Sequence, residues 1–251
     1  LKLPTGQGLF FPQASAYSKH EYGNRVGIFN VMEVLDRYGV RATAALDAMT
    51  AENYPFIVTE CMKLQWEFVG HGISIQRIIT SEMTEQEERE YIRTSLDAVE
   101  KATGQRPAGW LGQEYGESIR TPGLLAEAGI RYLCDWPNDD QPYRMKAPLY
   151  SLPVSLELDD LFAMAAPRFM GVMDYGRMLK DAFDTLYREG ENTGRLMVVN
   201  LHPYFIGQPF RVKYLEEALE HITAHPKVWK ATGQEIIDWY AQDYASSSGS
   251  S

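Results

Sequence analysis

The sequence predicts an α/β fold in which parallel strands close into a barrel. Short apolar segments alternate with helical segments along the chain, which is typical of a parallel sheet covered by helices. About seven apolar segments could be strands, which is enough to close a barrel. A length of 251 residues suits a single barrel domain. An open doubly wound sheet is disfavoured because no glycine-rich phosphate loop follows any strand.

The strand candidates are short apolar segments bounded by turn residues. They lie at residues 41–46, 67–70, 108–111, 131–134, 149–154, 196–201 and 228–231. The segment 196–201 is the most apolar of them, and Pro153 interrupts the segment 149–154. Because the strands are expected to be parallel, their carboxyl ends should meet at one rim of the barrel.

The helix candidates show apolar residues at helical spacing, and several have clear end signals. They lie at residues 25–38, 54–64, 84–103, 121–128, 175–188, 210–225 and 232–244. Thr84 with Glu87, and Thr232 with Glu235, form capping boxes that begin two of these helices. Gly104 is expected to end the longest helix.

Charge and cysteine content narrow the classes of function. The formal net charge of -10 disfavours binding to nucleic acid or to anionic membranes. No apolar run reaches the roughly 18 residues of a membrane span, and no signal peptide is recognisable. Cys61 and Cys134 lie far apart in apolar segments, which favours a reducing compartment over a disulfide framework. We therefore expect a cytoplasmic protein.

The chain is expected to contain one catalytic domain at residues 22–244. Residues 1–21 are expected to be an N-terminal loop region. Residues 245–251 are expected to be a linker or tag remnant, because 246–251 contain only Ser and Gly. No internal repeat and no long interior linker divides the chain.

Polar residues come directly after the carboxyl ends of four of the predicted strands. They form the clusters 70–72, 112–115, 135–136 and 200–203. In a parallel barrel the active site forms at the carboxyl ends of the strands. The sequence therefore predicts an active site at this rim, with His71 and His202 at its centre.

The two histidines occupy equivalent strand ends. His202 ends the most apolar strand and precedes Pro203, and an imidazole suits proton transfer near neutral pH. His71 lies between Gly70 and Gly72, which allow a ligand to approach the backbone closely. The alternatives are a strand-end cap for His202 and a buried, turn-stabilising histidine for His71.

Two carboxylates complete the predicted catalytic set. Glu114 could be a general base, a general acid or a metal ligand, or simply a polar loop residue. Asp135 could orient a histidine or hold substrate, or it could cap a turn. The residues expected to bind substrate are Trp110, Gln113, Tyr115, Trp136 and Tyr204. Aromatic side chains are, however, more often part of a core than of a pocket wall.

Other polar residues are expected to be structural. His221 and His225 have a spacing that can bind metal, but neighbouring glutamates favour a solvated helix face. His20 is expected in a surface loop, and Asp159 and Asp160 in a loop without a catalytic role. No GxSxG motif occurs and neither cysteine lies near a histidine in an obvious motif, which leaves attack by water with or without a metal ion.

Several stretches occur in an order that points to a known family. They are YGNRVG at 22–27, VLDRYGVRAT at 34–43, EFVGHG at 67–72, TGQRP at 103–107, LHPYFIGQPFR at 201–211 and VWKATGQEI at 228–236. With these stretches the chain resembles the polysaccharide deacetylase superfamily, and most closely its allantoinase-like branch. The ordered combination is more specific than any single stretch.

This resemblance implies a distorted (β/α)7-type barrel that hydrolyses a carbon–nitrogen bond in an amide, imide or ureide. Members of the superfamily hold a divalent metal such as zinc with one Asp and two His. Another Asp acts as base, and a late His acts as acid. His71 matches the first metal-binding histidine, so it would be a metal ligand if a metal binds. His202 matches the late acid.

The sequence departs from the superfamily pattern at the metal site. A second histidine should follow shortly after His71, but residues 72–76 contain none. The arginine expected after the Arg-Pro motif is absent near Leu111. Residues 1–21 contain no apolar strand ending in an Asp pair, so the first strand is expected to lie upstream or to be missing. These departures fit the allantoinase-like branch better than the sugar deacetylases.

The leading hypothesis is a hydrolase of small amides, cyclic imides or ureides. In it His71 and Glu114 activate water or hold a metal, His202 protonates the leaving nitrogen, and Asp135 helps to position the site. The first alternative is a metal-dependent polysaccharide N-deacetylase, and the second is a non-catalytic ligand-binding barrel. A small-molecule substrate is the expected partner, and the resemblance suggests a homo-oligomer.

Overall fold

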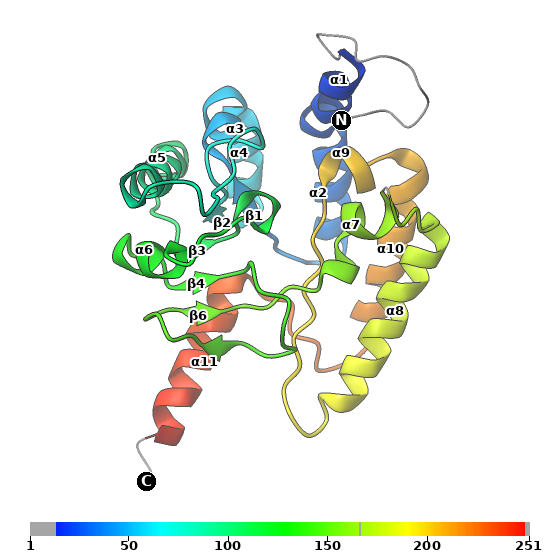
Figure 1. Cartoon of the computed structure of the whole chain (residues 1–251). Helices are drawn as coiled ribbons and strands as arrows, with labels where there is room; N and C mark the ends of the chain where they lie inside the picture. The colour runs from blue at the N-terminus through cyan, green and yellow to red at the C-terminus, as the bar shows by residue number, and fades with distance from the viewer. Residues whose placement is uncertain (1–13, 166, 249–251) are drawn as a thin grey trace.

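The structure, a computed structural model, describes residues 14–165 and 167–248, and a six-stranded sheet lies at its centre (Figure 1). The strands are β1 (Thr43–Leu46), β2 (Glu67–Gly70), β3 (Gly109–Trp110), β4 (Tyr132–Leu133), β5 (Tyr143–Arg144) and β6 (Tyr150–Ser151). Their order is β1-β2-β3-β4-β6-β5, and every neighbouring pair is parallel except β5 and β6. The predicted α/β fold with a parallel sheet is thus confirmed.

The strand register brings the ends of β1, β2 and β3 to one edge of the sheet. Leu46 lies opposite Gly70, and Gly70 lies opposite Trp110. The next residues along the chain are Asp47, His71 and Leu111, which therefore leave the sheet side by side. This edge positions the candidate site, as expected for parallel strands.

Helices surround the sheet and also build a separate helical side of the molecule (Figure 1). The helices are α1 (Ala14–Tyr22), α2 (Ile28–Arg37), α3 (Ala48–Asn53), α4 (Pro55–Lys63), α5 (Glu85–Thr103), α6 (Thr121–Glu127), α7 (Asp160–Met164), α8 (Val172–Glu189), α9 (Pro203–Ile206), α10 (Pro209–Thr223) and α11 (Gly233–Ser248). A π-helical turn at Gly23–Gly27 joins α1 to α2. Thr84 and Glu87 form the predicted capping box of α5, and Gly104 ends it with φ 76°.

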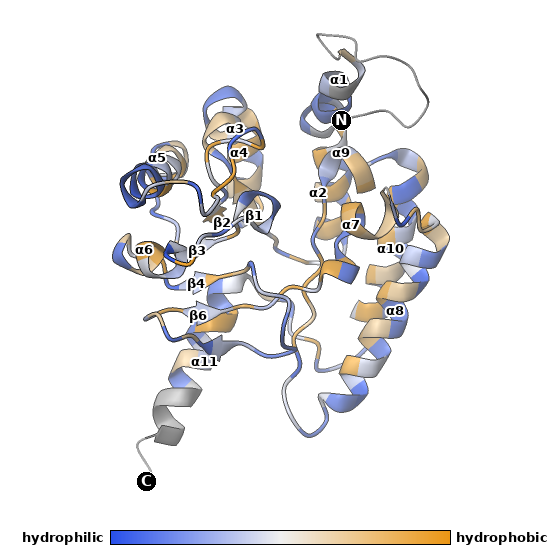
Figure 2. Ribbon diagram, viewed as in Figure 1, coloured by the Kyte–Doolittle hydropathy of each residue, from blue (hydrophilic) through white to orange (hydrophobic). Residues whose placement is uncertain are grey.

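The apolar faces of the helices form two main cores (Figure 2). One core packs α2, α7, α8, α9 and α10 together and includes the buried side chains of Tyr175, Leu179 and Ile206. The other packs α5 and α6 against β3 and β4 around Leu96, Leu125 and Trp110. The first core lies on the helical side and the second lies against the sheet. Residues from both sides therefore contribute to the candidate site described below.

In the described part of the chain, no strand hydrogen bonds join the two edges of the sheet into the predicted closed barrel. Residues 196–201 and 228–231, both expected as strands, carry no strand assignment. The segment 196–201 runs extended and is held at its ends, where Leu196 N–H donates to Asp140 O and Asp160 N–H donates to Asn200 O (2.8 and 3.1 Å). Apolar composition predicted its extended path, but strand pairing requires a neighbour in register.

The ends of the chain also differ from the expectation. Residues 14–21, expected as loop, belong to α1, while residues 1–13 lie outside the described part. The last helix α11 continues to Ser248, past the expected boundary at 244 and into the expected linker. Cys61 and Cys134 are free and buried, and burial raises the pKa of Cys61 to about 12. None of the described helices has the length and apolar character needed to cross a membrane.

Candidate active site

His202 is held by a buried carboxylate at the start of α9. Its Nδ1 lies 2.7 Å from Asp160 Oδ1, and its backbone N–H donates to both oxygens of the same carboxylate (3.0 and 3.1 Å). Asp160 is completely buried at the first residue of α7. Pro203 follows at the first position of α9, where a missing N–H costs no hydrogen bond. The three contacts fix both the position of His202 and the orientation of its ring.

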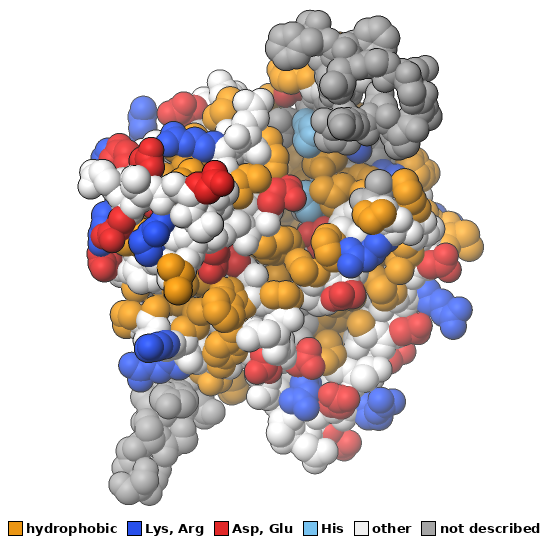
Figure 3. Space-filling model, viewed as in Figure 1, with side chains coloured by type: hydrophobic (Ala, Val, Ile, Leu, Met, Phe, Trp, Pro, Cys, Tyr) orange, Lys and Arg blue, Asp and Glu red, His pale blue; other side chains and the backbone are white. Residues whose placement is uncertain are grey.

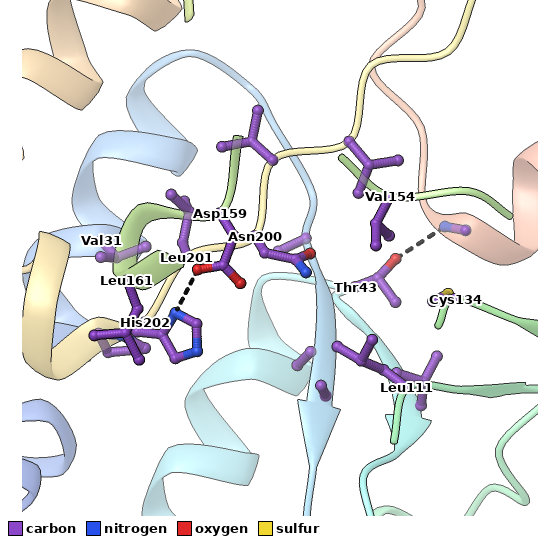
Figure 4. A pocket seen from close by; sticks show the side chains of 18 of the residues that line it. Val31, Thr43, Leu111, Cys134, Val154, Asp159, Leu161, Asn200, Leu201 and His202 are labelled. Atoms are coloured by element: carbon purple, nitrogen blue, oxygen red, sulfur yellow. Dashed lines mark hydrogen bonds and ion pairs between the residues drawn. The ribbon is translucent and has the colours of Figure 1, made fainter. Parts of the chain in front are cut away.

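A second carboxylate extends this arrangement across the cleft. Asp159 Oδ2 accepts a hydrogen bond from the Tyr115 hydroxyl (2.7 Å), and Asn200 Nδ2 donates to the same hydroxyl oxygen (2.6 Å). Asp159 Oδ1 lies 3.7 Å from His202 Nδ1. Figure 4 shows His202, Asp159 and Asn200 together on one wall. Asp160, expected in a loop, instead begins helix α7, and both carboxylates lie beside His202.

His71 lies at the opposite wall, at the end of β2. Its Nδ1–H donates to the Leu111 carbonyl (2.6 Å), which leaves Nε2 with a free lone pair. The flanking glycines are required by packing: a Cβ at Gly72 (φ 76°) would collide with the Tyr91 hydroxyl, and one at Gly70 would lie 2.7 Å from the Trp110 ring. The glycines thus hold the backbone of His71 against the core.

The surroundings move the pKa values of the two histidines in opposite directions. Burial lowers the pKa of His71, and the Leu111 carbonyl offsets this only in part. Burial also lowers the pKa of His202, but the hydrogen bond and charge of Asp160 outweigh it and raise this pKa above its ordinary value. Burial raises the pKa of Asp160 itself, while its bonds from His202 stabilise the ionised carboxylate. A neutral His71 facing a readily protonated His202 suits acid–base chemistry.

The loop after β3 carries backbone strain at the site. Glu114 and Tyr115 both have positive φ (51° and 57°), which is unfavourable for residues with a side chain. Beneath this loop, Asp135 accepts a hydrogen bond from Gly112 N–H (2.7 Å). Burial and the nearby Glu117 raise the pKa of Asp135 well above its ordinary value. Asp135 therefore supports the loop that presents Glu114.

The two walls face one open cleft of about 2860 Å³, a part of which is visible between the sheet and the helical side in Figure 3. Six of the predicted site residues line this cleft: His71, Gln113, Glu114, Tyr115, His202 and Tyr204. Asp47, which follows β1, also lines it, and sequence reasoning missed this residue. A signal was present, because Asp47 follows a predicted strand just as His71 does.

Three predicted site residues do not line the cleft. Trp110 is fully buried in the core beside Gly70, so its expected role in substrate binding is wrong. Trp136 turns toward Glu117, which accepts a hydrogen bond from its indole N–H (3.1 Å). Asp135 is buried beneath the loop and does not line the cleft. His20, expected at the surface, is exposed but its ring lies 4.2 Å from that of Tyr204 at the cleft.

The donor set around His71 does not fit the metal site that the superfamily resemblance implies. Within the described residues, two groups of three side chains could share an ion: Asp159, Asp160 and His202, and Asp184, His221 and His225. His71 belongs to neither group, and no second histidine follows it in residues 72–76. Among the described residues, His71 therefore lacks the partner ligands that this metal site would need.

A parallel sheet with ionisable side chains at its carboxyl edge is the arrangement found in α/β enzymes. The chain belongs to the polysaccharide deacetylase family. The family model described as polysaccharide deacetylase matches residues 12–133. A polysaccharide deacetylase homologue of Schizosaccharomyces pombe is 30% identical over 253 residues, which cover 92% of this chain and 78% of that protein.

Two further relatives show the range of the family. The peptidoglycan deacetylase of Helicobacter pylori is 24% identical over 255 residues, which cover 88% of this chain and 86% of that protein. The crystal structure of PuuE allantoinase is similar with a TM-score of 0.84 and 29% identity, covering 90% of this chain and 76% of that one. These homologues are carbon–nitrogen hydrolases, and this chain is an enzyme of the same class.

Proposed function

We propose that this protein hydrolyses a carbon–nitrogen bond other than a peptide bond, in a small amide, cyclic imide or ureide. The observation that carries the proposal is the pair of histidines at one cleft whose pKa values are moved apart, His71 downward and His202 upward. When the surroundings of two ionisable side chains move their pKa values apart, the group with the lowered pKa can serve as base and the group with the raised pKa as acid. Similarity to PuuE allantoinase over most of the chain supports this substrate class.

In the proposed reaction, His71 Nε2 accepts a proton from water while the oxygen attacks the substrate carbonyl carbon. The Glu114 carboxylate, also at the cleft, assists in orienting this water. His202 then donates its Nε2 proton to the leaving nitrogen and the carbon–nitrogen bond breaks. The products are a carboxylic acid and an amine, amide or urea, according to whether the substrate is an amide, an imide or a ureide. Asp160 holds Nδ1 of His202, so Nε2 is the atom left to donate. Gln113, Tyr115 and Tyr204 form the proposed substrate walls.

The test is turnover of a panel of cyclic imides, ureides and simple amides by the wild-type enzyme and by His202→Gln. Loss of a general acid should lower kcat by roughly 10²- to 10⁴-fold. The thermal unfolding temperature of the variant should stay close to that of the wild type, because the His202 side chain is about one-third exposed. Unchanged turnover in His202→Gln would discard this mechanism.

A second candidate function is N-deacetylation of a polysaccharide. Similarity to the Helicobacter pylori peptidoglycan deacetylase favours it, and the open cleft could hold an extended chain. Acetate release from N-acetylglucosamine oligomers, measured beside ring opening of the cyclic ureides, separates the two candidates. Acetate release without ring opening would replace the first proposal by the second.

We also propose that the protein is cytoplasmic and forms a homo-oligomer. The two buried free cysteines support a reducing compartment. Light scattering of the purified protein measures the number of chains in a particle, and fractionation of the source cells measures the compartment.

A further inference from the structure

A second cluster of metal-binding side chains lies on the helical side, where α8 and α10 pack together (Figure 1). Asp184 of α8 and His221 and His225 of α10 each offer one ligand atom, and these atoms all lie within 4.8 Å of one another. His221 Nε2 is 2.6 Å from Asp184 Oδ1. None of the three side chains lines the cleft, so this cluster is separate from the candidate active site.

The His225 imidazole is oriented as metal-binding histidines usually are. His225 Nδ1–H donates to the His221 carbonyl oxygen (2.8 Å), which leaves Nε2 of His225 with a free lone pair. A bond from the second ring nitrogen to a backbone carbonyl is the usual way in which a protein fixes a metal-binding imidazole. The rings of Phe183 and Tyr187 each lie 5.0 Å from the His225 ring and restrict its rotation.

The helices that carry the cluster form a rigid base. Gly176 of α8 allows close packing, since a Cβ there would lie 3.1 Å from the Tyr214 Cβ on α10. Tyr187 also donates a hydrogen bond from its hydroxyl to the Pro226 carbonyl (3.0 Å), which ties α8 to the end of α10. The four-residue spacing of His221 and His225 places both rings on one face of α10. Sites built on packed helices hold their ligands more precisely than sites on loops.

We propose that Asp184, His221 and His225 bind a divalent transition-metal ion such as Zn²⁺. Two imidazoles and a carboxylate suit this class of ion, and three protein ligands leave one tetrahedral position for water. Ligand distances of about 2.0–2.2 Å in a tetrahedral site would separate His221 Nε2 and Asp184 Oδ1 by roughly 3.4 Å, compared with 2.6 Å in their direct contact. Rotation of the exposed Asp184 side chain can supply this difference. The ion would link α8 to α10.

The experiment is a titration of the 251-residue chain with Zn²⁺, monitored by calorimetry, and with Co²⁺, monitored by visible absorption. The variants His225→Gln and Asp184→Asn remove one ligand each. Because the Asp184 side chain is exposed, the second variant should keep its fold, so a loss of ion binding in it reports on the ligand. His20→Gln controls for the loss of any histidine. His202→Gln controls for ion binding at the other group of three ligands.

We expect one bound Zn²⁺ per chain in the wild type and in both controls. In His225→Gln and Asp184→Asn the affinity should fall by roughly 10- to 100-fold or more. The tetrahedral Co²⁺ spectrum should vanish in the same two variants, while turnover stays at the wild-type level. Zn²⁺ binding that persists in both ligand variants, or that is lost in His202→Gln, would overturn the proposal.

Discussion

Asp160 determines what His202 can do. The carboxylate is completely buried and contacts His202 through its ring and through its backbone N–H. The raised pKa of His202 depends on this contact, since burial would otherwise lower it. Asp160 does not reach the reacting atoms in the proposed reaction, so it is a positioning residue and not a catalytic one.

We predict a specific change in the pH profile of Asp160→Asn. Activity requires protonated His202 and neutral His71, so it should fall as the pH rises through the raised pKa of His202 and as it drops through the lowered pKa of His71. The neutral amide should shift the alkaline limb of kcat/KM to lower pH by about one unit and reduce kcat by roughly tenfold or more. The acid limb should not move.

Asp181→Asn is the matched control, because Asp181 is an exposed aspartate on α8. Its pH profile should equal that of the wild type. An alkaline limb that stays in place in Asp160→Asn would show that this carboxylate does not set the pKa of His202.

At the scale of elements, the turn after β2 fixes His71 through glycine. Gly72 has a left-handed backbone, and a Cβ there would collide with the Tyr91 hydroxyl, which donates to Arg77 O (2.5 Å). On the other wall, Gly23 and Gly27 also allow close packing. Because they have no Cβ, the π-helical turn can pack directly on Pro203 and Tyr204. Close backbone contacts therefore hold both histidine-bearing segments.

Gly72→Ala should destabilise the protein by about 2 kcal/mol or more, because both the positive φ and the collision disfavour a side chain. Gly123→Ala is the control, since Gly123 lies inside α6 with open space around its Cα. That substitution should be neutral or stabilising by about 0.5–1 kcal/mol. Urea unfolding measures both values, and equal midpoints for the two variants would contradict this account of the turn.

At the scale of the whole molecule, the sheet side and the helical side each supply one wall of the cleft. His71 and Glu114 follow strands of the sheet, whereas His202 and Asp160 begin helices α9 and α7. The three ligands of the proposed ion site lie on α8 and α10 of the helical side and do not line this cleft. Chemistry and ion binding should therefore be separable.

We expect treatment with a chelator to leave kcat unchanged while it lowers the thermal unfolding temperature of Zn²⁺-loaded protein. The reason is that His71 lacks a partner ligand among the described residues, whereas Asp184, His221 and His225 form a group. Turnover and thermal unfolding are measured on the same chelated sample. Activity that disappears on chelation and returns with Zn²⁺ would place a metal in the reaction.

The sequence by itself determined the alternation of strands and helices, the capping of α5 and the strand-end position of His71. These features are local, because they depend on apolar periodicity and on residues a few positions apart. The segment 196–201 shows the limit: its apolar character predicted an extended path, but hydrogen bonding to a neighbouring strand depends on distant residues.

Only the tertiary structure decided the partners of the site residues. Asp160 lies 42 residues before His202, and Tyr115 lies 44 residues before Asp159, so no local pattern links them. The same holds for Asp184 and His221, which are 37 residues apart. Asp135 follows a predicted strand as His71 does, yet it lies beneath a loop, and Trp110, inside a strand, faces the core. Which way a side chain faces depends on contacts that exist only after folding.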